Sequence, residues 1–245
     1  MRQAGRYMEE YRKLRAEHDF LELCKNSELA SEITITPVER LAVDAAIVFA
    51  DILLVLEPMG IGLEYAKNGG PVIHHPVRSG KDVDALKEFN VKEELSFVYE
   101  AVKKTCKALK AKVPLIGFAG APFTLASYLI EGGGSRNYVH TKKFFYNAPE
   151  AWKRMMERLA KVITEYLNCQ IAAGAEAVQL FDSWAGCLTP PDYEHFVLPY
   201  SKAVIDGITP GISVIHFSTG TAGLLKHIRA AGGDVVGLDW RMNLD

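Results

Sequence analysis

The sequence contains few cysteines, and none of them belongs to a recognisable metal or disulfide motif. Neither Cys-x-x-Cys nor His-x-Cys occurs in the 245 residues, where the four cysteines are scattered: Cys24, Cys106, Cys169 and Cys187. A disulfide framework or a structural zinc site needs cysteines paired at short spacing. We therefore expect reduced thiols, no structural zinc ion and a cytoplasmic protein.

The sequence also lacks an uninterrupted apolar run and an excess of either charge. Its longest apolar stretch, residues 41–63, is broken by Asp44, Asp51 and Glu57, which predicts core structure and not a membrane span. The first twenty residues carry charges every few positions and have no apolar secretory core. The 28 Lys+Arg and 30 Asp+Glu give a formal charge of −2. This balance argues against nucleic acid as the main partner.

Short apolar runs alternate with polar helical patterns along the chain. Runs rich in Val, Ile, Leu and Phe, without strict alternation, are typical of strands buried on both faces. They cover residues 45–55, 113–121, 175–183, 212–220 and 234–240. Residues 91–112 and 147–174 predict helices, the second with Asn147 as its cap and Pro149 in its first turn. This order predicts an α/β fold with a parallel sheet and helices outside it.

Residues 60–80 depart from this alternation. KNGGP lies there between two short β-prone runs, which predicts a hairpin inserted in a strand-to-helix connection. The sequence shows no internal repeat, low-complexity tract or linker. We expect a single domain over residues 1–245.

Several predicted strands end in polar or small residues, with the endings FAD, FAGAP, FDS and FSTG. Ligands of parallel α/β folds bind beyond the carboxyl ends of strands. One such ending alone is better explained as a cap of the following helix. Four of them in one chain favour a shared pocket.

Arginine is concentrated at the N-terminus, which holds Arg2, Arg6, Arg12 and Arg15. Guanidinium groups bind carboxylates and phosphates in a fork-like geometry, and a tight turn at Gly5 can add backbone N–H donors. This pattern predicts an anion site. The alternative is a solvated helix face on which Glu9 and Glu10 pair the arginines, and for Arg12 the two interpretations are equally good.

Asp51 lies between the apolar stretches AAIVFA and ILLVL. A carboxylate amid so much apolar surface is costly unless it is paired or functional. We expect it to be held ionised in a pocket, where it stabilises a cation or accepts several N–H donors. The alternative is a salt-bridged or capping aspartate.

Three other features are less specific. FAGAPFTLASYLIEGGGS, residues 118–135, predicts a close-packed loop leading into a helix with Tyr128, but it has no phosphate-binding glycine pattern. Ser183 follows a predicted strand but lacks the GxSxG elbow of hydrolases. His216 falls in a buried strand pattern, where we expect a satisfied core histidine and not a ligand.

Five segments, taken in order, resemble the uroporphyrinogen decarboxylase family: MRQAGRYMEEYR, FADILLV, GFAGAPFTLASYLIEGGGS, QLFDSWAG and GLDW. The resemblance runs through essentially the whole chain, and RQAGRY and GFAGAP are highly specific motifs. It implies a (β/α)8 barrel of the TIM type that removes carboxyl groups from the four acetate side chains of uroporphyrinogen III. The product is coproporphyrinogen III, in haem and tetrapyrrole biosynthesis. The resemblance also implies a homodimer with no metal and no organic cofactor.

The resemblance implies roles for individual residues. The family's loop that binds substrate carboxylates matches Arg2, Gln3, Ala4, Gly5 and Arg6. Its essential aspartate, which accepts the pyrrole N–H groups, matches Asp51. Tyr128 and Ser183 match site residues, and Arg15 matches a further arginine near the cleft. Phe123 occupies a position where many members have tryptophan.

The implied chemistry agrees with these residue types. Protonation of a pyrrole α-carbon gives a cationic ring, which acts as the electron sink for loss of CO2. A buried carboxylate such as Asp51 would stabilise that cation. The group that donates this proton is either Arg2, a substrate carboxylic acid or a relayed water. Arg2 is not the obvious donor, since a guanidinium is a poor acid at its usual pKa.

The chain departs from the family at both ends. Met1 comes immediately before Arg2, where the family's first strand enters, and Asp245 follows soon after GLDW. The five runs and the start at Met1 make about six of the eight strands of a closed barrel. We therefore expect one barrel domain that lacks the start of the first strand and the last two βα units. Such a chain alone is expected to be unstable or inactive.

Two other functions stay open. Zinc-dependent corrinoid or thiol methyltransferases share the barrel superfamily, but they need a His-x-Cys that this sequence lacks. A non-catalytic porphyrinogen-binding remnant is the second alternative, because the ligand groups of Arg2, Arg6, Asp51 and Tyr128 are present.

Overall fold

The computed structural model describes residues 7–65 and 70–242, which fold around a parallel five-stranded sheet. The strand order is β1-β4-β5-β6-β7, and every neighbouring pair is parallel. The strands are β1 (Ala46–Ile47), β4 (Leu115–Gly120), β5 (Ala177–Asp182), β6 (Ser213–Ser218) and β7 (Val235–Gly237). A separate antiparallel hairpin pairs β2 (Leu63–Tyr65) with β3 (Pro71–Ile73). The predicted α/β class and the predicted hairpin are confirmed, and within the described residues the sheet does not close into a barrel.

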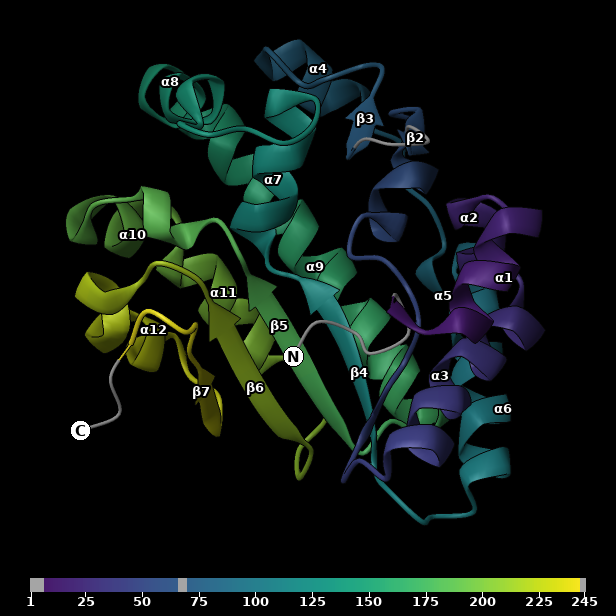
Figure 1. Cartoon of the computed structure of the whole chain (residues 1–245). Coiled ribbons are helices and arrows are strands. Elements are labelled where there is room, and N and C mark those ends of the chain that lie inside the picture. Colours follow the sequence, from purple (N-terminus) through teal and green to yellow (C-terminus); the bar gives the residue numbers. More distant parts are fainter. Residues whose placement is uncertain (1–6, 66–69, 243–245) are drawn as a thin grey trace.

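Helices join the strands and cover the sheet. They are α1 (Glu9–Glu17), α2 (Phe20–Lys25), α3 (Ser27–Leu41), α4 (Gly80–Ala85), α5 (Val91–Glu94), α6 (Ser96–Leu109), α7 (Pro122–Glu131), α8 (Val139–Asn147), α9 (Pro149–Ala173), α10 (Pro190–Phe196), α11 (Leu198–Asp206) and α12 (Leu225–Ala231). Short 3-10 helices are η2 (Leu54–Met59), η3 (Ala185–Cys187) and η4 (Ala222–Leu224). The arrows of β4, β5 and β6 point toward the end of the molecule where the hairpin, α7 and α8 lie (Figure 1). No helix of the described segments has the length and apolar character needed to cross a bilayer.

Two sequence predictions were wrong in detail. Of the first predicted strand, residues 45–55, only Ala46–Ile47 are strand. One further bond to β4 follows, from the Val48 N–H to the Ile116 carbonyl at 3.1 Å, and the chain then turns into η2. Asn147 does not cap the long helix α9. It ends α8, and the cap is Ala148, which precedes Pro149 and is therefore kept out of helical geometry. The proline in the first turn is confirmed.

The shortness of β1 leaves part of β4 without a strand partner, and a side chain takes its place. Gln170 of α9 is fully buried, and its amide accepts from the Phe118 N–H and donates to the Phe118 carbonyl, both at 3.0 Å. Gly117 makes room for this approach, since a Cβ there would lie 2.6 Å from the Gln170 Oε1. The amide thus bonds both backbone groups of Phe118, as a neighbouring strand would.

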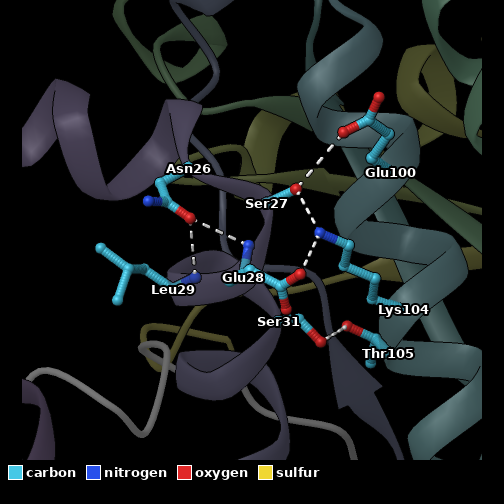
Figure 2. Close-up of polar contacts among 8 residues, drawn as sticks. All are labelled: Asn26, Ser27, Glu28, Leu29, Ser31, Glu100, Lys104 and Thr105. Carbon is cyan, nitrogen blue, oxygen red and sulfur yellow. Dashed lines mark hydrogen bonds and ion pairs between the residues drawn. The ribbon is translucent and has the colours of Figure 1, made fainter.

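The helices beside β1 are fixed to each other by polar contacts. The Asn26 side chain accepts from the N–H groups of Glu28 at 3.0 Å and Leu29 at 3.2 Å, which caps α3. Lys104 of α6 donates to the Ser27 hydroxyl at 2.8 Å and to the Glu28 carboxylate at 2.5 Å (Figure 2). These bonds hold α3 against α6 at the edge of the sheet that leads to Asp51.

The hairpin is attached to the end of α7. The Ile73 N–H donates to the Gly132 carbonyl at 2.8 Å, and the Val77 N–H donates to the Leu129 carbonyl at 2.9 Å. The insertion is therefore bonded to the helix that holds Tyr128, above the carboxyl ends of the strands (Figure 1).

Candidate active site

Asp51 follows the first strand and is partly buried. Its Oδ1 accepts the Leu53 N–H at 2.9 Å and the Tyr65 hydroxyl at 2.5 Å. The first bond is local and resembles the capping alternative predicted from the sequence. The second comes from the hairpin and joins two separate parts of the fold, so capping alone does not account for this carboxylate.

Tyr128 of α7 lies within electrostatic reach of the same carboxylate. Burial, and then the negative charge of Asp51, raises the pKa of Tyr128 to about 12. The same two causes raise the pKa of Tyr65 still further, together with its hydrogen bond to Asp51. Buried Tyr166 of α9 also has a raised pKa, mainly from burial and with a smaller contribution from Asp51. We call Asp51, Tyr65 and Tyr128 the Asp51 cluster.

An aromatic wall connects this cluster to the end of β5. Tyr128 packs edge-to-face on Trp184 with ring centroids 5.8 Å apart, and Tyr138 lies on Trp184 at 5.6 Å. Trp184 is the neighbour of Ser183, whose carbonyl accepts the Thr219 hydroxyl at 2.5 Å. The structure therefore places the QLFDSWAG segment beside Tyr128.

Glycine is required at position 186 for this arrangement. A Cβ on Gly186 would overlap the Thr219 carbonyl oxygen and come within 2.8 Å of the Gly220 carbonyl oxygen. The loops after β5 and β6 thus approach each other more closely than any other residue at 186 allows.

The polar residue at the end of β5 has its contacts with α7 and β6. Asp182 is fully buried, the Thr124 hydroxyl of α7 donates to it at 3.4 Å, and the His216 Nε2 lies 3.8 Å away. His216 is also fully buried, as expected, but neither of its ring nitrogens has a hydrogen-bond partner among the described residues. The expectation of a satisfied histidine was wrong.

The predicted anion site lies largely outside the described residues, and so do all five loop residues: Arg2, Gln3, Ala4, Gly5 and Arg6. Arg15 is described, and its guanidinium donates to the His18 carbonyl at 2.8 Å, just past the end of α1. Glu9 pairs with Lys13 at 2.9 Å and Glu10 with Arg40 at 3.4 Å. Both carboxylates thus have cationic partners other than the N-terminal arginines.

All four cysteines are free of disulfide bonds. Burial raises the pKa of the Cys187 thiol, beside the aromatic wall, to about 11. Across residues 7–65 and 70–242, no three or more His, Cys, Asp or Glu side chains form a group able to hold a metal ion.

Sequence reasoning missed Tyr65 and Trp184. Tyr65 ends a β-prone run beside KNGGP, a position that gives no hint of a contact with a residue 14 positions earlier. Trp184 did have a signal, because an aromatic residue directly beyond a predicted strand end lies where ligands bind.

Comparison with known proteins gives a consistent result across the chain. A sequence profile of uroporphyrinogen decarboxylase (URO-D) matches residues 1–245. A uroporphyrinogen decarboxylase from Carboxydothermus hydrogenoformans is 55% identical over 246 residues, which cover 100% of this chain and 70% of that protein. A uroporphyrinogen decarboxylase from Solibacter usitatus is 52% identical, with 100% of this chain and 71% of that protein covered.

A solved structure supports the fold class. A methyltransferase from Methanosarcina mazei superposes with a TM-score of 0.76 at 17% sequence identity, over 88% of this chain and 63% of that one. At this identity the likeness concerns the fold alone, whereas the profile and the relatives concern the sequence itself. The chain belongs to the uroporphyrinogen decarboxylase family.

Proposed function

We propose that this protein decarboxylates the four acetate side chains of uroporphyrinogen III without a cofactor and gives coproporphyrinogen III. The family membership supports the reaction class. The observation that carries the proposal is the position of Asp51, beside the carboxyl ends of parallel strands, with Tyr65 bonded to it and Tyr128 within reach of its charge. A carboxylate in this setting can accept the N–H groups of a tetrapyrrole.

The chemistry requires a negative charge where positive charge develops. Protonation of a pyrrole α-carbon makes the ring cationic, and the electrons of the breaking C–CO2 bond flow into that ring. Asp51 would then face the cation across a short distance in a partly buried site, where electrostatic stabilisation is stronger than in water. The methylene takes up a proton and becomes a methyl group, and the α-carbon releases its proton when the aromatic ring re-forms.

The other site residues are proposed to bind and orient the substrate. Tyr128 packs on Trp184, and Ser183 is the residue before Trp184 in the chain, so the hydroxyls of Tyr128 and Ser183 are proposed to make polar contacts with substrate side chains. Arg2 and Arg6, with the backbone of Gln3, Ala4 and Gly5, are proposed to bind carboxylates, because guanidinium groups pair with them in bidentate fashion. Arg15 is proposed as a further cation near the cleft.

The test is a turnover assay of the complete gene product with uroporphyrinogen III, kept anaerobic, with a metal chelator present. Products are oxidised to porphyrins and separated by their number of carboxyl groups. We expect species that have lost from one to four carboxyl groups. Binding without loss of any carboxyl group would show a porphyrinogen-binding protein, and zinc-dependent methyl transfer would show a methyltransferase.

We also propose a homodimer in the cytoplasm. The absence of disulfides among the four cysteines fits a reducing compartment. Light scattering of the purified protein measures the assembly directly, with twice the chain mass expected and the mass of a monomer contradicting the proposal.

A further inference from the structure

The chemistry described above gives the Tyr65 hydroxyl no role of its own, although this hydroxyl is bonded to Asp51. The phenol oxygen lies 2.5 Å from the Asp51 Oδ1, which also accepts the Leu53 N–H at 2.9 Å. A hydrogen bond to an ionised carboxylate is short and about twice as strong as one between neutral groups. Two donors therefore converge on one oxygen of this carboxylate and fix its orientation.

Tyr65 is itself held in place by two other parts of the fold. Its ring packs on Phe20 of α2 with centroids 4.7 Å apart, and Phe20 packs on Phe49, two residues before Asp51, at 6.0 Å. Its strand β2 pairs with β3, with Tyr65 opposite Pro71. Since β3 is bonded to the end of α7, the hairpin connects the Asp51 loop to the helix that holds Tyr128.

We propose that Tyr65 is a positioning residue, whose hydroxyl anchors the Asp51 carboxylate in the orientation in which it receives the pyrrole N–H groups. Its catalytic consequence rests on the proposed decarboxylation. The aromatic packing keeps the hydroxyl aimed at Asp51 before substrate arrives, so the orientation does not have to be established during the reaction. The hairpin thereby supplies a functional group to the site at the carboxyl ends of the parallel strands.

The donor role of Tyr65 holds throughout the working pH range. Burial, and then the charge of Asp51, raises the pKa of Tyr65 far above neutrality, so its hydroxyl keeps its proton. The titratable groups linked electrostatically to this pair, within the part of the chain that the structure describes, are Cys24 of α2, Tyr128 of α7 and Tyr166 of α9. Removal of the phenol donor leaves the ionised carboxylate less stabilised, so Asp51 should take up a proton more readily.

The test compares Tyr65→Phe with Tyr99→Phe. Phenylalanine keeps the ring that packs on Phe20 and removes only the hydroxyl. Tyr99 is the matched control, because it is a buried tyrosine of α6 whose hydroxyl donates to the Val91 carbonyl at 3.0 Å. Steady-state kinetics with uroporphyrinogen III, across pH, are measured for both variants of the complete gene product.

For Tyr65→Phe we expect kcat to fall about tenfold to a hundredfold, which corresponds to the loss of one charge-assisted hydrogen bond. KM should stay within about twofold, and the acidic limb of the kcat/KM profile should move to higher pH. Tyr99→Phe should leave kcat, KM and the pH profile unchanged. Unchanged kcat in Tyr65→Phe, or a loss confined to KM or to thermal stability, would overturn the inference.

A second measurement does not depend on turnover. The side-chain carboxyl 13C resonance of Asp51, assigned by its disappearance in Asp51→Asn, is titrated in the parent, in Tyr65→Phe and in Tyr99→Phe. Its midpoint should rise in Tyr65→Phe alone, and an unmoved midpoint would overturn the inference. A parent that binds uroporphyrinogen III without decarboxylating it would refute the proposed function, and the titration would then decide separately whether Tyr65 acts on Asp51.

Discussion

Gln170→Leu should destabilise the protein far more than an ordinary surface change. The amide of Gln170 makes both hydrogen bonds to the Phe118 backbone, at 3.0 Å each, in a fully buried position. Leucine fills similar volume but leaves a buried N–H and a buried carbonyl without partners, at about 1–3 kcal/mol each. The expected loss is thus about 2–6 kcal/mol, against a total of about 5–15 kcal/mol for a typical protein.

Thermal unfolding measures this loss. At about 2–4 °C per kcal/mol for a chain of this size, the melting temperature should fall by roughly 4–24 °C. Asn168→Leu is the matched control, because Asn168 lies on the same helix and its amide also bonds two backbone groups, the Gly207 carbonyl and the Thr209 N–H, both at 2.9 Å. Those groups are exposed, so water can replace the amide and the loss should be smaller. Equal losses for the two variants would refute the reasoning that burial sets the cost.

Two further predictions concern the loops around the aromatic wall. Gly186→Ala should lower the free energy of unfolding by about 1–3 kcal/mol, because the added Cβ meets the carbonyl oxygens of Thr219 and Gly220. Unfolding in denaturant measures this loss, and an unchanged midpoint would contradict the close approach of the two loops. Cys187 should react with iodoacetamide more slowly at pH 8 than free cysteine does, because burial raises the pKa of its thiol to about 11 and the thiolate forms only as the pH approaches that value. Mass spectrometry of the labelled peptide measures the rate of reaction. Labelling as fast as that of free cysteine at pH 8 would contradict the raised pKa.

The parallel sheet was predictable because buried strands leave a simple pattern in the sequence. The run at 175–183 is rich in apolar residues and becomes β5 (Ala177–Asp182), and the run at 212–220 becomes β6 (Ser213–Ser218). The strand predicted over residues 45–55 is too long, because an apolar run does not show where the chain turns. Its last bond to β4 is that of the Val48 N–H to the Ile116 carbonyl at 3.1 Å, after which the chain enters η2.

The site was predictable only where a residue violated its local context. Asp51 was recognisable as a charge amid apolar residues, and the structure gives it a hydroxyl donor from the hairpin. Tyr65 does not stand out from its neighbours in the sequence, because tyrosine is common in β-strands. Its importance comes from a contact across the fold, which no local pattern encodes.

The most direct test of the account is the rate of CO2 release by Asp51→Asn acting on uroporphyrinogen III. Asparagine keeps the size of the side chain but removes the charge that faces the cationic ring, so the rate should fall at least about a hundredfold, as for the loss of other electrostatic groups that stabilise transition states. Asp44→Asn, which changes an exposed carboxylate seven positions earlier, should keep the parental rate. Release of CO2 by Asp51→Asn at the parental rate would contradict the central role of this carboxylate.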